Sequence, residues 1–234
     1  MEKFKLITNS AEPKIIGTRN GVYQVEFEDE KLEKHPNFKE LDRIFISPGK
    51  RNIAEFNKEV LNLKIETIKG ELIKRAKITD FMGFCPYFFG CNYLISENVN
   101  EAFKESQIDK SEINLLPIEL RNDNSKYFIL FAPMIPHEEI IFNESILYPS
   151  RQQILEKKDY LEINSFEEYK ENIDKSVFVN FERIVLPNKY KTKSIISIQG
   201  VSGLFFSSKL AKSCLNRNLT SFRFSNMEIE LSFK

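Results

Sequence analysis

Residues 92–103 read NYLISENVNEAF, and this stretch predicts a strand that runs directly into a helix. Asn92–Ile95 is a short, largely apolar run of the kind found in buried strands. Ser96 stands at the position of a helix N-cap, and Glu97 puts a carboxylate in the first turn, where it favours the helix dipole. The apolar residues beyond them share one helical face: Val99, Ala102 and Phe103. We expect this strand and this helix to pack in one core.

A second strand–serine–helix stretch follows later, at residues 204–218. Leu204–Phe206 predicts a strand, Ser207 or Ser208 can cap the helix, and Asn218 can end it in a left-handed conformation. The buried stripe predicted for this helix is Leu210, Ala211, Cys214 and Leu215. Because a strand followed by a capped helix is common in mixed proteins, we interpret the recurrence as a common pattern and not as a duplication.

Periodicity predicts further elements between and after these stretches. The helix and strand pattern repeats over Ile113–Leu120 and Tyr127–Phe131, and the second run is continuous enough for a central strand. Residues 222–233 contain an alternating run, which predicts a terminal hairpin.

The first third of the chain is expected to be rich in strands. Tyr23–Phe27 alternates between apolar and polar residues, and Asn20-Gly21 predicts a tight hairpin turn between this run and Ile15–Ile16. Arg43–Ile46 predicts a short buried strand, and Gly70 predicts the turn of a second hairpin. A helix is expected where apolar residues fall at helical spacing: Ile53, Phe56 and Val60.

Together these elements predict an α+β fold with mixed, largely antiparallel sheets and a few short helices. With 234 residues, the chain is long enough for one large domain or two small ones. We expect an N-terminal β-rich subdomain over residues 1–78 and an α+β core over residues 79–234.

The charge balance argues against polyanionic partners. Lys and Arg together number 34, as do Asp and Glu, so the net charge is zero. No overall field then attracts nucleic acid or acidic lipid, and neither is expected as a partner. The first residues lack the apolar region of a signal peptide, and no apolar run is long enough to span a bilayer. We therefore expect a soluble protein of the cytoplasm.

Metal and cofactor chemistry is not indicated. The three cysteines are too few for a disulfide framework, and Cys85 and Cys91 do not have the spacing of a zinc knuckle. His35 and His137 each stand beside a proline, with no second imidazole near in sequence. No metal and no cofactor is expected.

Residues 80–91 are dense in aromatic residues, glycine and proline, which predicts a loop with apolar side chains. Half or more of these aromatic side chains are expected to pack beneath the loop. Those that remain exposed are expected to contact a partner, because aromatic side chains are enriched at interface hot spots. The candidates are Tyr87, Phe88 and Phe89.

Several of these segments resemble a family of immunity proteins from bacterial polymorphic-toxin and contact-dependent competition systems. Residues 80–103 resemble the middle signature of that family, and Ile140–Ser145 resembles a segment in which a serine follows a strand. The C-terminal pattern is carried by Val185–Pro187, Ile195–Ile198, Gly200–Gly203, Leu204–Leu210 and Thr220–Phe224. The resemblance extends over residues 78–226. It implies a protein that is encoded beside a toxin, binds that toxin and blocks it without a cofactor.

Two groups of acidic residues leave several interpretations open. Glu26, Glu28, Asp29, Glu30 and Glu33 form the densest acidic run. This run is most simply a solvated strand end and turn, but it is also compatible with acid–base or metal chemistry, or with complementarity to a basic toxin surface. In the second group His137 precedes Glu138 and Glu139, and such a lone histidine is most often a surface or packing residue.

The function predicted from these observations is that of an immunity protein, not an enzyme. It would occlude the active site or substrate channel of a toxin that acts in the cytosol, through an interface of roughly 1,600 Å² in total. The expected contacts are Tyr87, Phe88 and Phe89, with Glu138 and Glu139 at the rim. The alternatives are an enzyme that reverses toxin damage, with Glu28–Glu30 or His137–Glu139 as its site, and an adaptor without a toxin partner.

Overall fold

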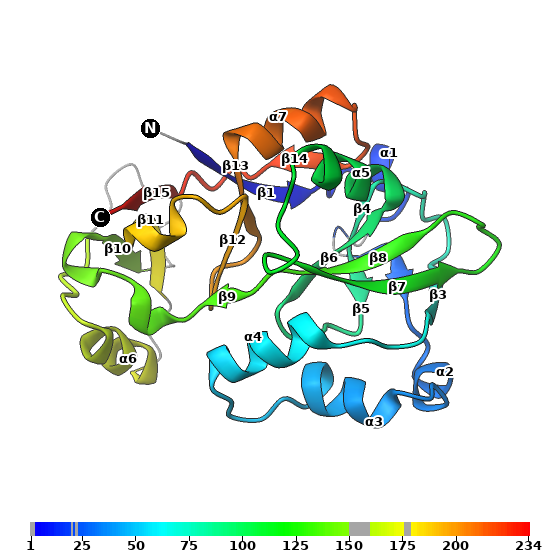
Figure 1. Cartoon of the computed structure of the whole chain (residues 1–234), viewed down its shortest axis with the longest axis horizontal. Coiled ribbons are helices and arrows are strands. Elements are labelled where there is room, and N and C mark those ends of the chain that lie inside the picture. The colour runs from blue at the N-terminus through cyan, green and yellow to red at the C-terminus, as the bar shows by residue number, and fades with distance from the viewer. Residues whose placement is uncertain (1–2, 20, 22, 150–159, 176–178) are drawn as a thin grey trace.

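A computed structural model describes residues 3–19, 21, 23–149, 160–175 and 179–234. The described residues form three β-sheets and several short helices (Figure 1). The predicted α+β class is confirmed, since the sheets mix parallel and antiparallel pairs and the helices are short. Among the described residues, no helix is both long enough and apolar enough to cross a lipid bilayer.

The largest sheet has seven strands and is covered by helices on both faces (Figure 1). Its strands, in spatial order, are β4 (Phe81–Met82), β6 (Cys91–Ser96), β8 (Tyr127–Phe131), β7 (Asn114–Leu120), β3 (Ile68–Leu72), β2 (Val25–Glu26) and β5 (Phe84–Cys85). One face packs on α2 (Asp29–Glu33), α3 (Phe38–Leu41), the π-helix η1 (Asp42–Ile46) and α4 (Ile53–Asn62). The helix predicted around Phe56 is confirmed as α4, whose N-cap is the Asn52 side chain.

The five-stranded sheet shares a core with the seven-stranded sheet, separate from the core beneath α2, α3 and α4. Its order is β14 (Phe222–Phe224), β1 (Phe4–Asn9), β13 (Leu204–Ser207), β12 (Ile195–Ile198) and β9 (Met134–Ile135). The helices α5 (Glu97–Glu105) and α7 (Ser208–Asn216) contact each other, and their buried residues share one core with strands of both sheets. In Figure 1 these two helices lie above the seven-stranded sheet, opposite α3 and α4.

A third core joins the five-stranded sheet to a small sheet and α6 (Phe166–Asp174). The small sheet consists of β10 (Ile146–Pro149), β11 (Val179–Leu186) and β15 (Glu230–Phe233). The shorter helices are α1 (Pro13–Ile16), η2 (His137–Glu139), η3 (Phe142–Glu144) and η5 (Asn188–Tyr190).

Two four-stranded units of the same topology account for the centre of the fold. The first unit consists of β4, β6, β8 and β7 with α5, and the second of β12, β13, β1 and β14 with α7. All neighbouring strands within each unit are antiparallel, and in each unit the second strand leads directly into the helix. The second unit takes its third strand, β1, from the start of the chain.

The strand register of the two units also agrees. Ser96, which precedes α5, pairs with Tyr127, and Ser207, at the end of β13 before α7, pairs with Phe4. The matching pairs on the other side are Phe81 with Ile95 and Ile195 with Phe206. The recurrence seen in the sequence therefore extends to a whole structural unit and is more than a common pattern.

The units contact each other reciprocally. Thr220, which lies before the last strand of the second unit, binds Asp80, which precedes the first strand of the first unit. In the reverse direction Glu112 lies before the last strand of the first unit. Its carboxylate accepts the backbone N–H groups of Ser194 and Ile195, at the start of the second unit, at 2.6 and 3.2 Å. Such reciprocity is the property of a twofold interface.

Asp80 is the most connected side chain of this interface. Its Oδ1 accepts the Ser96 hydroxyl at 2.6 Å, and its Oδ2 accepts both the backbone N–H and the hydroxyl of Thr220 at 2.7 Å. Partial burial opposes ionisation, but these hydrogen bonds outweigh it and hold the pKa of the Asp80 carboxyl below its ordinary value. Ser96 occupies the predicted N-cap position of α5, yet its side chain makes no cap hydrogen bond and donates to Asp80.

Several predicted elements are wrong. Arg43–Ile46 belongs to η1, and Ile15–Ile16 to α1, because a short apolar run fits a helix as well as a strand. Gly70 lies inside β3 instead of in a turn; a Cβ there would come within 2.9 Å of the Phe27 ring, so the glycine admits that ring. Ile113–Leu120, assigned to the helical part of the repeated pattern, forms β7 and buries every second residue near its end.

The end of the chain also differs from the prediction. Residues 222–233 do not form a hairpin, because β14 pairs with β1 and β15 pairs in parallel with β11. Of the predicted stripe on α7, Leu210, Ala211 and Cys214 are buried, but Leu215 is 51% exposed. Asn218 has the predicted left-handed conformation. The predicted turn at Asn20-Gly21 includes Asn20, which lies outside the described residues.

The expected boundary at residue 78 does not separate the sheets. β1 pairs with β13 and β14, and β3 pairs with β7, so strands from residues 1–78 join both larger sheets. The first 78 residues also contain α1 to α4 and η1, and are not mainly strands.

Asp80→Asn is expected to lower the free energy of unfolding by about 2 kcal/mol at neutral pH, because an amide offers one acceptor oxygen where the carboxylate offers two. The pKa of Asp80 is depressed in the folded state, so its stabilisation is complete above the ordinary value of 3.8 and is lost as the pH falls through the lower folded pKa. Urea denaturation as a function of pH measures both effects.

Asp123→Asn provides the control, because Asp123 accepts a single local backbone bond from Ser125. It should change the unfolding free energy by less than about 0.5 kcal/mol. Equal losses in the two variants would contradict the central role of Asp80.

Candidate functional site

The aromatic loop after β5 presents one ring to solvent. Tyr87 is 63% exposed, whereas Phe88 is fully buried and stacks on Phe45 with ring centroids 5.2 Å apart. Phe89 is half-buried and packs edge-on against Phe56. The expectation that Phe88 contacts a partner is therefore wrong for the folded chain, since its ring belongs to the core beneath the loop. Tyr87 alone among the three candidates is largely exposed.

An acidic hollow of about 510 Å³ reaches the aromatic loop at Cys85 and Pro86, the two residues before Tyr87. It is lined by Glu26, Phe27, Glu28, Asp29, Glu30, Cys85 and Pro86. The parallel pairing of β2 with β5 places Glu26 opposite Cys85, and α2 then begins at Asp29. This pairing brings the acidic run next to the aromatic loop. Glu33, the remaining member of the run, is exposed on α2 outside the lining.

The carboxylates of the hollow are only partly neutralised. Lys31 lies 3.0 Å from Glu28 and also pairs with Glu71, and these hydrogen bonds raise the pKa of Lys31. Within the described part of the chain, no cation forms an ion pair with Glu26, Asp29 or Glu30. The hollow therefore keeps a local negative charge, although the whole chain has none.

The thiol of Cys85 is not activated by this environment. Burial raises the pKa of Cys85, and the carboxylates of Glu26 and Asp29 raise it further. A thiol with a raised pKa is a poor nucleophile, because only the thiolate attacks. No set of three or more histidine, cysteine or acidic side chains is arranged to hold a metal ion in the ranges that the structure describes.

The second acidic group, around His137, is mostly engaged in packing. Glu139 pairs with Lys189, and Glu138 is exposed. The His137 ring packs edge-on against the Tyr169 ring of α6, with the ring centroids 4.9 Å apart. The backbone N–H of His137 donates to the side-chain oxygen of Gln199. His137 therefore helps to hold α6 on the core, which agrees with the packing interpretation of this lone histidine.

No protein-family model matches the chain, and a search of curated protein sequences finds no significant match. The resemblance to immunity proteins thus stays a prediction.

Sequence reasoning identified both parts of the acidic hollow but not their contact. The acidic run and the aromatic loop are separated in the chain by η1, α3, α4 and β3. Val25 and Phe84 are partners in a two-residue parallel pair, and so short a pair leaves no periodic signal in the sequence.

His137 should titrate below its ordinary value of 6.5, because burial lowers the pKa of its imidazole. The unfolded chain then binds more protons than the folded chain, so stability falls as the pH drops below that value and levels off below the folded pKa. Histidine NMR signals followed against pH measure the pKa. In His137→Gln this part of the pH dependence of unfolding should disappear; an unchanged dependence would contradict the assignment.

Proposed function

We propose that this chain is an immunity protein that binds a protein toxin in the cytoplasm and blocks it. The observation that carries the proposal is the exposed Tyr87 ring, in the loop whose Pro86 lines a hollow with carboxylates that form no ion pair in the described part of the chain. The resemblance of residues 78–226 to immunity proteins supports it independently.

The two features of this surface supply different parts of binding. An exposed tyrosine offers a large, stiff contact area with a polar tip, and such residues dominate the energy of many interfaces. The carboxylates of Glu26, Asp29 and Glu30 attract a basic patch, which raises the association rate and disfavours acidic partners. A toxin with lysine or arginine side chains around its active site fits this surface.

Buried aromatic residues support the contact surface from below. Phe88 is enclosed by Phe27, Phe45 and Phe84, with ring centroids 5.8, 5.2 and 5.7 Å away. The base of the loop is therefore rigid before binding, so little conformational entropy is lost when Tyr87 is covered. Phe88 acts in this account by positioning the loop, without touching the toxin. Glu138 is exposed on η2, outside the lining of the acidic hollow.

Blocking needs no bond-making step in this account. The immunity protein covers the toxin's active site or substrate channel, so protection requires at least one molecule for each toxin molecule. Protection at much lower ratios would instead show an enzyme that reverses the damage.

Tyr87→Ala should weaken binding of the protein encoded by the adjacent gene by at least about 2 kcal/mol, roughly a 30-fold rise in Kd. Calorimetry measures the Kd, and growth during co-expression measures protection. Tyr160→Ala is the matched control, because Tyr160 is similarly exposed at 55%. A neighbour that is harmless, or a toxic neighbour that the unaltered chain neither binds nor restrains, would refute the proposal.

Asp29→Lys should slow association by about tenfold at low salt, because it reverses a charge that attracts the partner. The rate of the unaltered chain should fall as salt is added, and the rate of the variant should depend less on salt. Glu55→Lys is the matched control, since Glu55 likewise lies in the first turn of a helix, α4. Stopped-flow measurements decide the point, and identical salt dependence in the three proteins would argue against steering by the hollow.

A further inference from the structure

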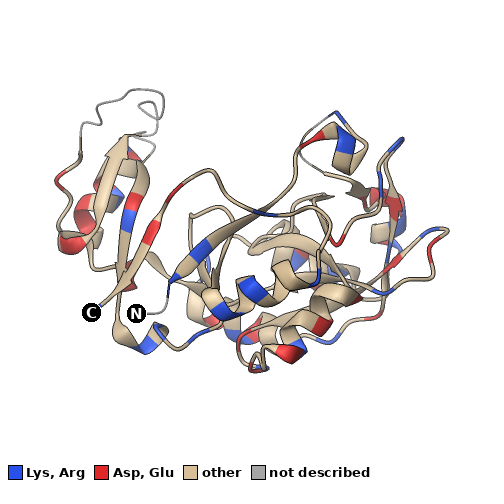
Figure 2. Cartoon of the chain, turned by 90° about the horizontal axis from the view of Figure 1, so that it is seen from above, with Lys and Arg blue, Asp and Glu red and all other residues tan. Residues whose placement is uncertain are grey.

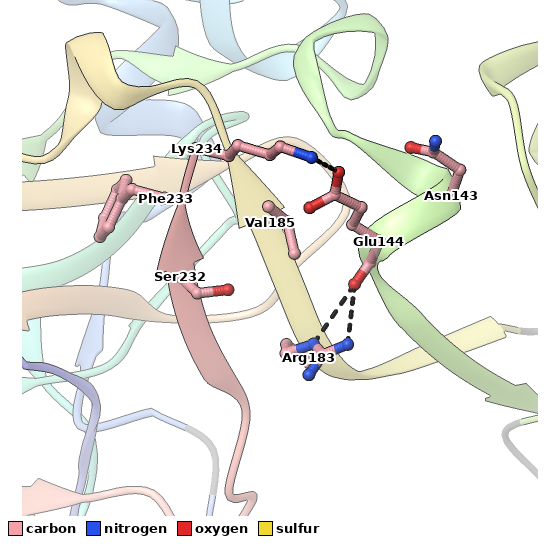
Figure 3. A pocket seen from close by; sticks show the side chains of 7 residues that line it. All are labelled: Asn143, Glu144, Arg183, Val185, Ser232, Phe233 and Lys234. Carbon is pink, nitrogen blue, oxygen red and sulfur yellow. Dashed lines mark hydrogen bonds and ion pairs between the residues drawn. The ribbon is translucent and has the colours of Figure 1, made fainter.

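A second hollow, of about 470 Å³, lies on the outer face of the small sheet (Figure 3). Its lining is formed by Asn143, Glu144, Arg183, Val185, Ser232, Phe233 and Lys234. These residues come from η3, β11, β15 and the residue that follows β15. Figure 3 shows η3 on one side of the hollow and β15 on the other, with β11 between them.

The wall of this hollow is fixed by hydrogen bonds to β11. Val185 donates its backbone N–H to the Ser145 hydroxyl at 3.0 Å and accepts the N–H of Ile141 at 2.9 Å. The segment that contains η3 is thus attached at both ends. Its polar groups hold their positions without a ligand, as a preorganised site requires.

Arg183 brings a positive charge that no carboxylate neutralises in the described parts of the chain. Its Nε and Nη2 donate to the backbone oxygen of Glu144 at 3.3 and 3.0 Å. A carbonyl oxygen fixes the guanidinium plane but carries no full charge. The remaining N–H groups of the guanidinium keep the fork geometry that fits two oxygens of one anion.

The other side chains of the hollow offer hydrogen-bond donors, and the charge of its one carboxylate side chain is compensated. The Glu144 carboxylate pairs with Lys234, so its negative charge is already compensated. Ser232 is half-buried and points its hydroxyl into the hollow (Figure 3). Asn143, on the opposite wall, contributes a side-chain amide.

We propose that this hollow binds an oxyanion, a phosphate or a carboxylate group, held by the Arg183 guanidinium and the Ser232 hydroxyl. The charge that Arg183 gives this hollow is positive, whereas the charge of the acidic hollow is negative. The two sites are therefore suited to different ligands, and the anion site does not depend on the proposed toxin.

Titration of the isolated chain with inorganic phosphate and, separately, with acetate tests the proposal. NMR should show saturable shifts of the Arg183 Nε signal and of the Ser232 and Glu144 amides, with a Kd of about 1 mM or tighter for one probe. Tighter binding of phosphate would identify phosphate groups as the ligand class, and tighter binding of acetate would identify carboxylates.

Arg183→Gln should weaken binding of the better probe by at least about tenfold, because it removes the charge and the fork. Ser232→Ala leaves the guanidinium and its anchor in place and should weaken binding about threefold to tenfold, which keeps the test valid if Arg183→Gln fails to fold. Arg121→Gln is the control, since Arg121 is an exposed arginine that pairs with Glu71. Shifts that do not saturate, or an unchanged Kd in Ser232→Ala and any folded Arg183→Gln, would overturn the proposal.

Discussion

One carboxylate, that of Asp80, accepts hydrogen bonds from both halves of the fold at the place where they meet. Ser96 approaches from the first unit and Thr220 from the second, and an ionised side chain with two oxygens can satisfy all of these donors. The Ser96 hydroxyl makes no cap hydrogen bond to α5. The Asp80 carboxylate also accepts the side-chain amide of Asn98, in the first turn of α5, where a negative charge favours the helix dipole. A single residue thereby links the start of α5 to the segment that precedes β14.

The candidate binding surface lies on the part of the fold that the two units do not share. Only the first unit is extended by β3, β2 and β5. This extension ends in the short β2 and β5 pair, where the acidic run meets the aromatic loop. The two units of matching topology provide a large core, and the added strands and helices provide the surface chemistry. A fold of this kind can change its partner through the extension while the Asp80 interface stays intact.

The sequence predicted those elements whose signal is local. The strand and helix around Ser96 followed from one apolar run and one helical face, and α4 followed from spacing alone. Strand pairing was not predictable in the same way. The alternation of residues 227–233 indicates a strand, but nothing in it specifies β11 as its partner. The exposure of the aromatic side chains could not be predicted for a similar reason. Tyr87, Phe88 and Phe89 are alike in sequence, and Phe88 is buried because Phe27, Phe45 and Phe84 surround its ring in the fold. The acidic run was recognised, but its hollow depends on a contact between distant segments.

A net charge of zero conceals two local fields of opposite sign. Acidic and basic residues are interspersed along the chain (Figure 2), so a local field depends on which charged groups the fold brings together. In the described parts of the chain Glu26, Asp29 and Glu30 form no ion pair and line one hollow, and Arg183, on β11 beside β15, forms none and lines the other. At physiological ionic strength charges are screened over about 8 Å, so each field acts only on a group that is close to it. Balanced composition is therefore compatible with selective recognition of a basic partner at one site and of an anion at the other.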